Sequence, residues 1–247
     1  MIESSLSFEQ VTEKVHLFTG EMAELYTEHL NGYLSEKELE RASVILGHQD
    51  QTTFITCRAY LRILLASYLE IPLEQVLFEH GVNGKLSVKG HKCYFNYSHA
   101  NGSFVIVISR NAAVGVDIEH KNRKVAYVKL KDILFSEYEI DRFEQFPEER
   151  KNEVFLNCWT QKEAIFKAKG TGLSSPLKEL ELDLSVDREP RILRTAWSEM
   201  EKDQWTVMRL PENDQWIGTL AVNAGVDKIE VVCHDPINEF LNYLVYS

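Results

Sequence analysis

Two carboxylates that lie two residues apart in an apolar segment constrain this chain more than any other feature. The segment Val114–His120 (VGVDIEH) is rich in small and β-branched residues and predicts a strand. Side chains alternate across a strand, so Asp117 and Glu119 project from one face while Val116 and Ile118 point into a core. Like charges in this setting repel and are costly to bury unless a cation lies between them. Hard cations such as Mg²⁺ take oxygen ligands, so the pattern favours a metal site.

A long helix is predicted to follow, and it carries a third carboxylate. Pro147 and the two acids after it are typical of a helix start, and Lys169-Gly170 is typical of a helix end. Between them apolar residues recur at helical spacing, at Val154, Phe155, Cys158, Trp159, Ile165 and Phe166. Glu163 and Lys167 are four residues apart and therefore share one face. If this helix packs on the strand, Glu163 joins the carboxylate pair and completes a metal site.

Each of these features also has a purely structural interpretation. An Asp-x-Glu pair on its own is most often a solvated strand face, and a Glu–Lys pair at this spacing is usually a surface ion pair. Their joint occurrence with particular neighbours favours a functional interpretation. The sequence GVDIEH followed by WTQKEAIFK (159–167) resembles the paired signature of the Sfp-type 4′-phosphopantetheinyl transferases.

The resemblance implies a reaction and gives roles to these side chains. Members of the family transfer the 4′-phosphopantetheine arm of coenzyme A to a serine hydroxyl of an apo acyl or peptidyl carrier protein and release adenosine 3′,5′-bisphosphate. It implies that Asp117, Glu119 and Glu163 hold Mg²⁺ and that Glu163 takes the serine proton. Lys167, as a catalytic residue, and Lys162 would then stabilise charge on the pyrophosphate oxygens.

The same resemblance extends to coenzyme binding. FNYSHA (95–100) matches the family's other signature and implies that Ser98 and His99 contact the coenzyme phosphates, although alone the pair also fits a turn bonded to backbone. Gly84 and Lys85 resemble the start of the family's G-K-P element, with Leu86 in place of the proline. Lys85 is therefore expected to make a phosphate or adenine-side contact.

A basic clamp for the 3′-phosphate of the coenzyme is implied for the helix predicted near residues 35–46. Arg41 is suitably placed, but Glu38 stands near the position where the family has a second basic residue. Arg58 and Arg62, four residues apart on the next predicted helix, could compensate or could be ordinary surface charges. How this phosphate is held stays open.

The composition limits the partners and the compartment. With 247 residues, 44% of them hydrophobic, the chain can bury a substantial core. A formal net charge of −11 argues against binding a nucleic-acid backbone. No run of residues predicts a membrane span or a signal peptide, and the cysteines form no C-x-x-C pair. A cytoplasmic location is therefore expected, and the resemblance implies a monomer.

The order of predicted elements indicates an α+β fold, because helices and sets of adjacent short strands alternate in blocks. After the motif helix, several strands and a last helix at 236–245 are predicted. The resemblance implies a 4′-phosphopantetheinyl transferase-like fold of two similar halves, 1–112 and 113–247, each with an antiparallel sheet and a long helix. The halves would pack as a pseudo-dimer, with the active site at their junction.

A basic run begins directly after the carboxylate strand and offers a surface for the protein partner. It contains Lys121, Arg123, Lys124, Lys129 and Lys131. Because the whole chain is acidic, attraction of an acidic carrier needs a local basic surface of this kind. A charge run is usually a solvated face without a partner, and here that interpretation and the partner-binding one are about equally supported.

Two other functions stay open at this point. One is a different Mg²⁺-dependent phosphoryl or nucleotidyl transferase that uses the same carboxylates. The other is a non-catalytic protein that binds coenzyme A, although the presence of all three carboxylates and Lys167 argues against a dead site. The sequence does not distinguish carriers of fatty-acid, polyketide or nonribosomal peptide synthesis.

Overall fold

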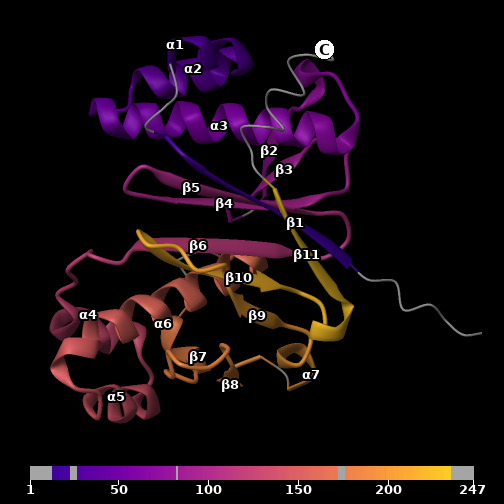
Figure 1. Cartoon of the computed structure of the whole chain (residues 1–247). Coiled ribbons are helices and arrows are strands. Elements are labelled where there is room, and N and C mark those ends of the chain that lie inside the picture. Colours follow the sequence, from indigo (N-terminus) through magenta and orange to yellow (C-terminus); the bar gives the residue numbers. More distant parts are fainter. Residues whose placement is uncertain (1–12, 23–26, 82, 172–175, 198, 235–247) are drawn as a thin grey trace, which may run out of the picture.

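Two β-sheets lie face to face in the middle of the molecule, and helices cover both outer faces (Figure 1). The computed structural model describes residues 13–22, 27–81, 83–171, 176–197 and 199–234. Apolar side chains of both sheets fill the space between them, including Leu17, Val107, Val116 and Leu220. This combination of sheets and helices confirms the predicted α+β class. The predicted helix at 236–245 lies outside the described residues.

The first sheet contains strands from both ends of the described chain. Its order is β11-β1-β5-β4, with β1 at Glu13–Glu21, β4 at Tyr94–Ala100, β5 at Ser103–Ser109 and β11 at Ile229–His234. Every residue of the internal strand β5 is buried. Strand β11 runs parallel to β1, whereas the other neighbours are antiparallel. A strand that follows the second sheet in sequence thus completes the first sheet.

A 22-residue helix, α3 (His48–Leu69), covers the outer face of the first sheet. Its apolar side chains share a core with β4 and β5, including Tyr60, Leu61, Phe95, Phe104 and Ile106. The smaller elements of this part are α1 at Thr27–Leu30, α2 at Glu36–Ser43, β2 at Phe78–His80 and β3 at Leu86–Val88, with 3₁₀ turns at Asn31–Tyr33 and Leu73–Gln75.

The second sheet carries the carboxylates. It is antiparallel in the order β6-β10-β9, with β6 at Val114–His120, β9 at Thr206–Arg209 and β10 at Trp216–Val222. Helix α6 (Glu148–Lys169), also 22 residues long, packs on its outer face. Beyond α6 lie α4 at Tyr127–Leu134, α5 at Glu137–Glu144, β7 at Leu180–Leu182, β8 at Ile192–Thr195 and α7 at Glu199–Lys202, with 3₁₀ turns at Leu177–Glu179 and Val226–Lys228. The strand and the helix predicted for the motif are both confirmed.

No helix in the described ranges is long and apolar enough to cross a bilayer.

Helix α6 touches strand β6 at Gly115. A methyl group at this position would lie 2.1 Å from the carbonyl oxygen of Ala164 and 2.4 Å from the backbone nitrogen of Ala168. Only glycine therefore lets α6 come this close to β6. The contact brings Glu163 and Lys167 against the strand that carries the carboxylate pair.

We expect Gly115→Ala to lower the free energy of unfolding by about 3 kcal/mol, because a methyl group forced against helix backbone overpacks the interface. Gly225→Ala is the matched control, since its φ of −64° suits alanine and nothing lies within 4 Å of the new methyl group. Its effect should stay within about 0.5 kcal/mol. Urea unfolding measures both variants, and equal stability of the two would contradict the close contact.

Candidate active site

Three predicted site residues meet where β4, β6 and α6 come together. The Ser98 hydroxyl donates to Asp117 Oδ1 at 2.9 Å, and the Lys167 ammonium donates to the same oxygen at 2.6 Å. Lys167 Nζ also lies 3.4 Å from Ser98 Oγ. Strand alternation directs the Asp117 side chain away from the core between the sheets. The close contact at Gly115 brings α6, and with it Lys167, next to Asp117.

Ser98 has a different partner from the predicted one. It is buried, and besides binding Asp117 its oxygen accepts from the backbone N–H of Ile118 at 3.3 Å. Asn96, two residues earlier, accepts from Val116 N at 2.9 Å in the same way. These side chains join β4 to the edge of β6. These bonds show that Ser98 holds the Asp117 carboxylate in position, and its contact with coenzyme phosphate stays a prediction.

His99 points to the opposite face of β4 from Ser98, because successive strand residues alternate. Its side chain is exposed, in contrast to the buried Ser98. Partial desolvation lowers the pKa of His99, and the positive charge of Lys167 adds to this effect. In either protonation state the imidazole has at least one N–H donor for a phosphate oxygen.

The three predicted carboxylates influence one another. Burial, together with the charges of Asp117 and Glu119, raises the pKa of Glu163 to about 7 against the opposing charge of Lys167. Burial also raises the pKa of Asp117, against the opposing effect of Lys167. Burial raises the pKa of Glu119 as well, and its ion pair with Arg123 opposes this. The site therefore holds three coupled carboxyl groups and two cations.

The donor set of this cluster fits a hard cation. Asp117 Oδ2 and Glu163 Oε1 are both buried and have no hydrogen-bond partner among the described residues. Such orphaned oxygens are costly unless a cation or water satisfies them. The described residues contain no ready-made group of three metal-binding side chains, and Lys167 and Arg123 neutralise two of the three carboxylates.

Lys162 does not reach the site, which corrects the prediction that it contacts the pyrophosphate. Its side chain is fully buried on another face of α6. The ammonium donates to Glu139 Oε2 at 2.7 Å, to the Leu134 carbonyl at 2.7 Å and to the Leu177 carbonyl at 3.0 Å. All three of its donors are used. Lys162 is therefore a structural residue that ties α6 to the segments around α4, α5 and β7.

A basic groove runs beside the cluster, between α2, α3, the β2–β3 hairpin and β4. It consists of two adjoining cavities of about 620 and about 210 Å³, which share Arg41, Arg58, His80 and Leu86 in their lining. Gly84 and Lys85 line the smaller cavity together with Asn96 and Tyr97. Since Ser98 follows Tyr97, this groove leads along β4 toward the carboxylates. The structure thus brings Arg41, Gly84 and Lys85 to one cavity.

Lys85 is bonded to the end of α6. Its ammonium donates to the Ala168 carbonyl at 2.6 Å and lies 3.3 Å from the Val114 carbonyl. Burial lowers the pKa of Lys85 to about 8. The hairpin that carries Gly84 (φ +80°) thereby connects the groove to the helix of Glu163. A phosphate contact would require Lys85 to exchange one of these carbonyl partners.

The structure explains the acid at position 38. Glu38 caps α2 through Ser35 and lies 3.5 Å from Arg58 Nε and 3.4 Å from Arg62 Nη1. Arg62 is structural, because it also bonds the carbonyls of Tyr33, Val76 and Leu73. Arg58 lines both cavities of the groove, with its guanidinium 4.9 Å from the centre of the Phe78 ring. Arg58 is the groove residue that the sequence offered only as an alternative.

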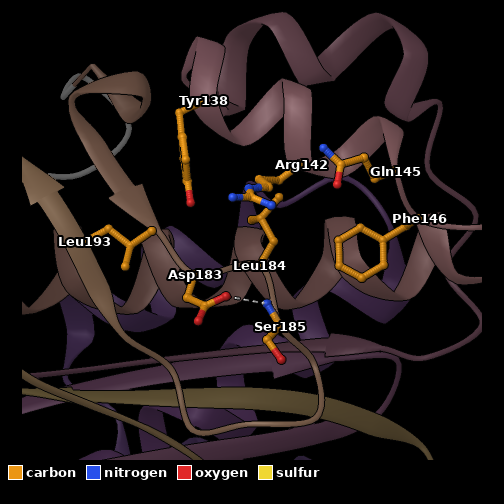
Figure 2. Close-up of a pocket in the computed structure, with 8 residues that line it drawn as sticks. All are labelled: Tyr138, Arg142, Gln145, Phe146, Asp183, Leu184, Ser185 and Leu193. Carbon is orange, nitrogen blue, oxygen red and sulfur yellow. Dashed lines mark hydrogen bonds between the residues drawn. The ribbon is translucent and has the colours of Figure 1, made fainter.

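Another hollow, of about 470 Å³, is lined by none of the predicted residues (Figure 2). It lies between α5 and the segments around β7 and β8, and Tyr138, Arg142 and Asp183 border it. Its one drawn hydrogen bond joins Asp183 Oδ1 to the Ser185 backbone N–H at 3.0 Å. It carries no cluster of coupled groups, so we assign the site to the carboxylates.

Comparison with known proteins agrees with the resemblance. A family model described as the 4′-phosphopantetheinyl transferase superfamily matches residues 113–221, which include β6 and α6. This match and the relatives named 4′-phosphopantetheinyl transferases confirm the resemblance that the sequence predicted.

Individual relatives carry the same name. A putative 4′-phosphopantetheinyl transferase of Synechocystis is 33% identical over 150 residues, and the match spans 60% of this chain and only 61% of that protein. The 4′-phosphopantetheinyl transferase HetI of Nostoc is 28% identical over 219 residues, 86% of this chain and 89% of HetI. Among solved structures, holo-ACP-synthase from Plasmodium yoelii matches 46% of this chain and 94% of its own at 17% identity, with a TM-score of 0.34.

Proposed function

We propose that this chain transfers the 4′-phosphopantetheine arm of coenzyme A to a serine of an apo acyl or peptidyl carrier protein. The observation that carries the proposal is the meeting of Asp117, Glu163 and Lys167 beside a basic groove, with two buried carboxylate oxygens that lack partners. Similarity to the 4′-phosphopantetheinyl transferases supports the same reaction. Adenosine 3′,5′-bisphosphate is the other product.

Glu163 is the proposed general base for the serine hydroxyl. In the metal-free site the pKa of Glu163 is about 7, near the pH at which a base works best, and a bound cation would lower it and favour the ionised form that accepts a proton. Lys167 neutralises charge on the pyrophosphate, while Ser98 holds Asp117 in place. Asp117, Glu119 and Glu163 would hold Mg²⁺, whose charge would stabilise the phosphate oxygens during displacement.

The groove is the proposed coenzyme site, with Arg41 on its exposed side. Arg41 lies on α2, and its guanidinium is 5.3 Å from the centre of the Phe54 ring. Arginine is well suited to phosphate because its donors form a fixed fork. Arg58 and His99 flank the path along β4 toward the carboxylates. Together they would hold the coenzyme phosphates.

Arg41→Ala should raise the KM for coenzyme A about tenfold and leave kcat nearly unchanged, as expected when a charge-assisted contact of binding is lost. The same change should leave the KM for dephospho-coenzyme A unaltered, since that substrate lacks the 3′-phosphate. Lys92→Ala, an exposed lysine that does not line the groove, is the control. Equal losses on both substrates would remove Arg41 from the 3′-phosphate.

The carrier is proposed to dock beside α4. Lys121, Lys124 and Lys129 are exposed and form no ion pair among the described residues. The predicted basic surface is smaller than the sequence suggested, because Arg123 pairs with Glu119 and Lys131 pairs with Glu144. Apolar side chains of α4 extend this surface, with Val128 68% and Ile133 60% exposed. An acidic partner with apolar contacts fits such a face.

The remaining parts of the proposal concern architecture and location. Each sheet is covered by one 22-residue helix, which supports two similar halves, 1–112 and 113–247, packed as a pseudo-dimer within a monomer. Strand β11 belongs to the second half in sequence but pairs with β1 in the first sheet, so the two halves exchange one strand. Cys57, Cys93 and Cys158 are buried free thiols, which suits a reducing cytoplasm.

The proposal is tested by following the small product. Coenzyme A, Mg²⁺ and an apo acyl carrier protein should release adenosine 3′,5′-bisphosphate, and the same carrier with its acceptor serine replaced by alanine should not. Release without any carrier would favour another Mg²⁺-dependent phosphoryl or nucleotidyl enzyme. Tight binding of coenzyme A with no release from any carrier would favour a non-catalytic coenzyme A-binding protein.

A further inference from the structure

Arg123 connects the carboxylate cluster to the basic surface. It forms an ion pair with Glu119, four residues earlier. The Glu119 side chain is 14% exposed and the Arg123 side chain 50%, so the pair lies at the boundary between the cluster and solvent. Arg123 stands between Lys121 and Lys124 in the sequence. The Arg123 guanidinium therefore lies between the carboxylate cluster and the basic surface and can contribute to either.

The backbone around Arg123 is held in place. Its N–H donates to the His120 carbonyl at 2.9 Å, and its own carbonyl accepts from Asn152 Nδ2 at 3.0 Å. The oxygen of Asn152 accepts from Val125 N at 3.1 Å. Lys121 N donates to the Gln215 carbonyl at 2.9 Å. The guanidinium can therefore leave Glu119 by side-chain rotation alone.

A divalent cation at the cluster would compete with Arg123. The carboxylate of Glu119 is needed as a ligand, and a double positive charge beside it repels the guanidinium. Lys167 occupies the equivalent place on Asp117, but its side chain is only 26% exposed and it is also bonded to Ser98 and Val116. Arg123, half exposed, has an open path to solvent. It is the cation that a metal ion would displace outward.

We propose that Arg123 is a metal-controlled latch for the carrier, an inference that rests on the proposed function. Without a divalent cation it stays on Glu119 and neutralises part of the cluster. With the cation bound it turns outward and joins Lys121 and Lys124 in a surface for acidic partners. Binding energies are reciprocal, so the metal strengthens carrier binding and the carrier strengthens metal binding. The protein would thus bind a carrier preferentially when the divalent cation occupies the site.

The test measures binding without turnover. Calorimetry measures the affinity of this protein for an acyl carrier protein whose acceptor serine is replaced by alanine. The titration is done at constant ionic strength, with and without Mg²⁺. For the unchanged enzyme we expect Mg²⁺ to tighten carrier binding about tenfold. For Arg123→Gln we expect that ratio to fall to about one, and Mg²⁺ itself to bind about threefold more tightly because its competitor is gone. For Lys124→Gln, carrier binding should weaken in both states while the ratio persists.

Two results would overturn the latch. One is an unchanged Mg²⁺ effect on carrier affinity in Arg123→Gln. The other is an unchanged Mg²⁺ affinity in Arg123→Gln, measured by titrating the metal alone, so this arm decides even if no carrier binds. Product release by the unchanged enzyme tests the proposed function separately, and the latch can fail while that activity stands.

Discussion

Replacing Glu163 with glutamine is expected to reduce phosphopantetheine transfer by about 10²–10⁴-fold, the usual contribution of a positioned general base. Glutamine keeps the shape of the side chain but can neither accept the serine proton nor offer a charged ligand. Steady-state assay with coenzyme A and carrier measures the loss. Retention of more than a tenth of the activity would remove Glu163 from both roles.

The same variant separates chemistry from folding. Burial raises the pKa of Glu163 from 4.5 to about 7, so the ionised carboxylate opposes folding and stability falls as the pH rises through that interval. Glu163→Gln escapes this loss. Without Mg²⁺ it should therefore melt above the unchanged protein at about pH 8, and the difference should disappear below about pH 4.5. A lower melting temperature at the higher pH would contradict this electrostatic account.

Lys162→Met is expected to lower the free energy of unfolding by about 3–5 kcal/mol, because it leaves the buried Glu139 carboxylate without its cation. The pair is fully buried, and the ammonium also holds the Leu134 and Leu177 carbonyls. Denaturant unfolding measures the loss. A loss of transfer with unchanged stability would instead return Lys162 to the active site.

A second variant checks that the effect comes from the unpaired charge. Glu139→Leu combined with Lys162→Met should recover part of the lost stability, since neither charge then remains buried alone. Full recovery is not expected, because Glu139 also accepts from the backbone N–H groups of Ser136 and Leu182. Lys129→Met, on the exposed side of α4, should change little. Equal effects of Lys129→Met and Lys162→Met would contradict the buried-pair account.

Local patterns in the sequence predicted the parts of the site that depend on one element at a time. Strand alternation predicted that Asp117 and Glu119 share a face, and helical spacing predicted that Glu163 and Lys167 do. The glycine in the strand is explained by the close approach of α6. These features follow from periods of two and 3.6 residues, which a single sequence displays.

The rest depended on partners that are distant in sequence. Lys162 and Glu163 differ by about 100° around the helix, and no local rule indicates which one faces the strand. Only the fold brings Glu139 to Lys162, 23 positions away. Ser98 likewise bonds Asp117, 19 positions away. The parallel pairing of β11 with β1 joins distant segments and was not predicted.

Intact mass spectrometry of an apo carrier protein tests the central claim most directly. The carrier is incubated with this protein, coenzyme A and Mg²⁺, with Glu163→Gln in a parallel reaction. The account predicts that the unchanged protein adds the mass of one phosphopantetheine arm to the carrier at its acceptor serine, and that Glu163→Gln does so at a rate lower by about 10²-fold or more. An unmodified carrier across acyl and peptidyl types, or equal modification by both proteins, would contradict it.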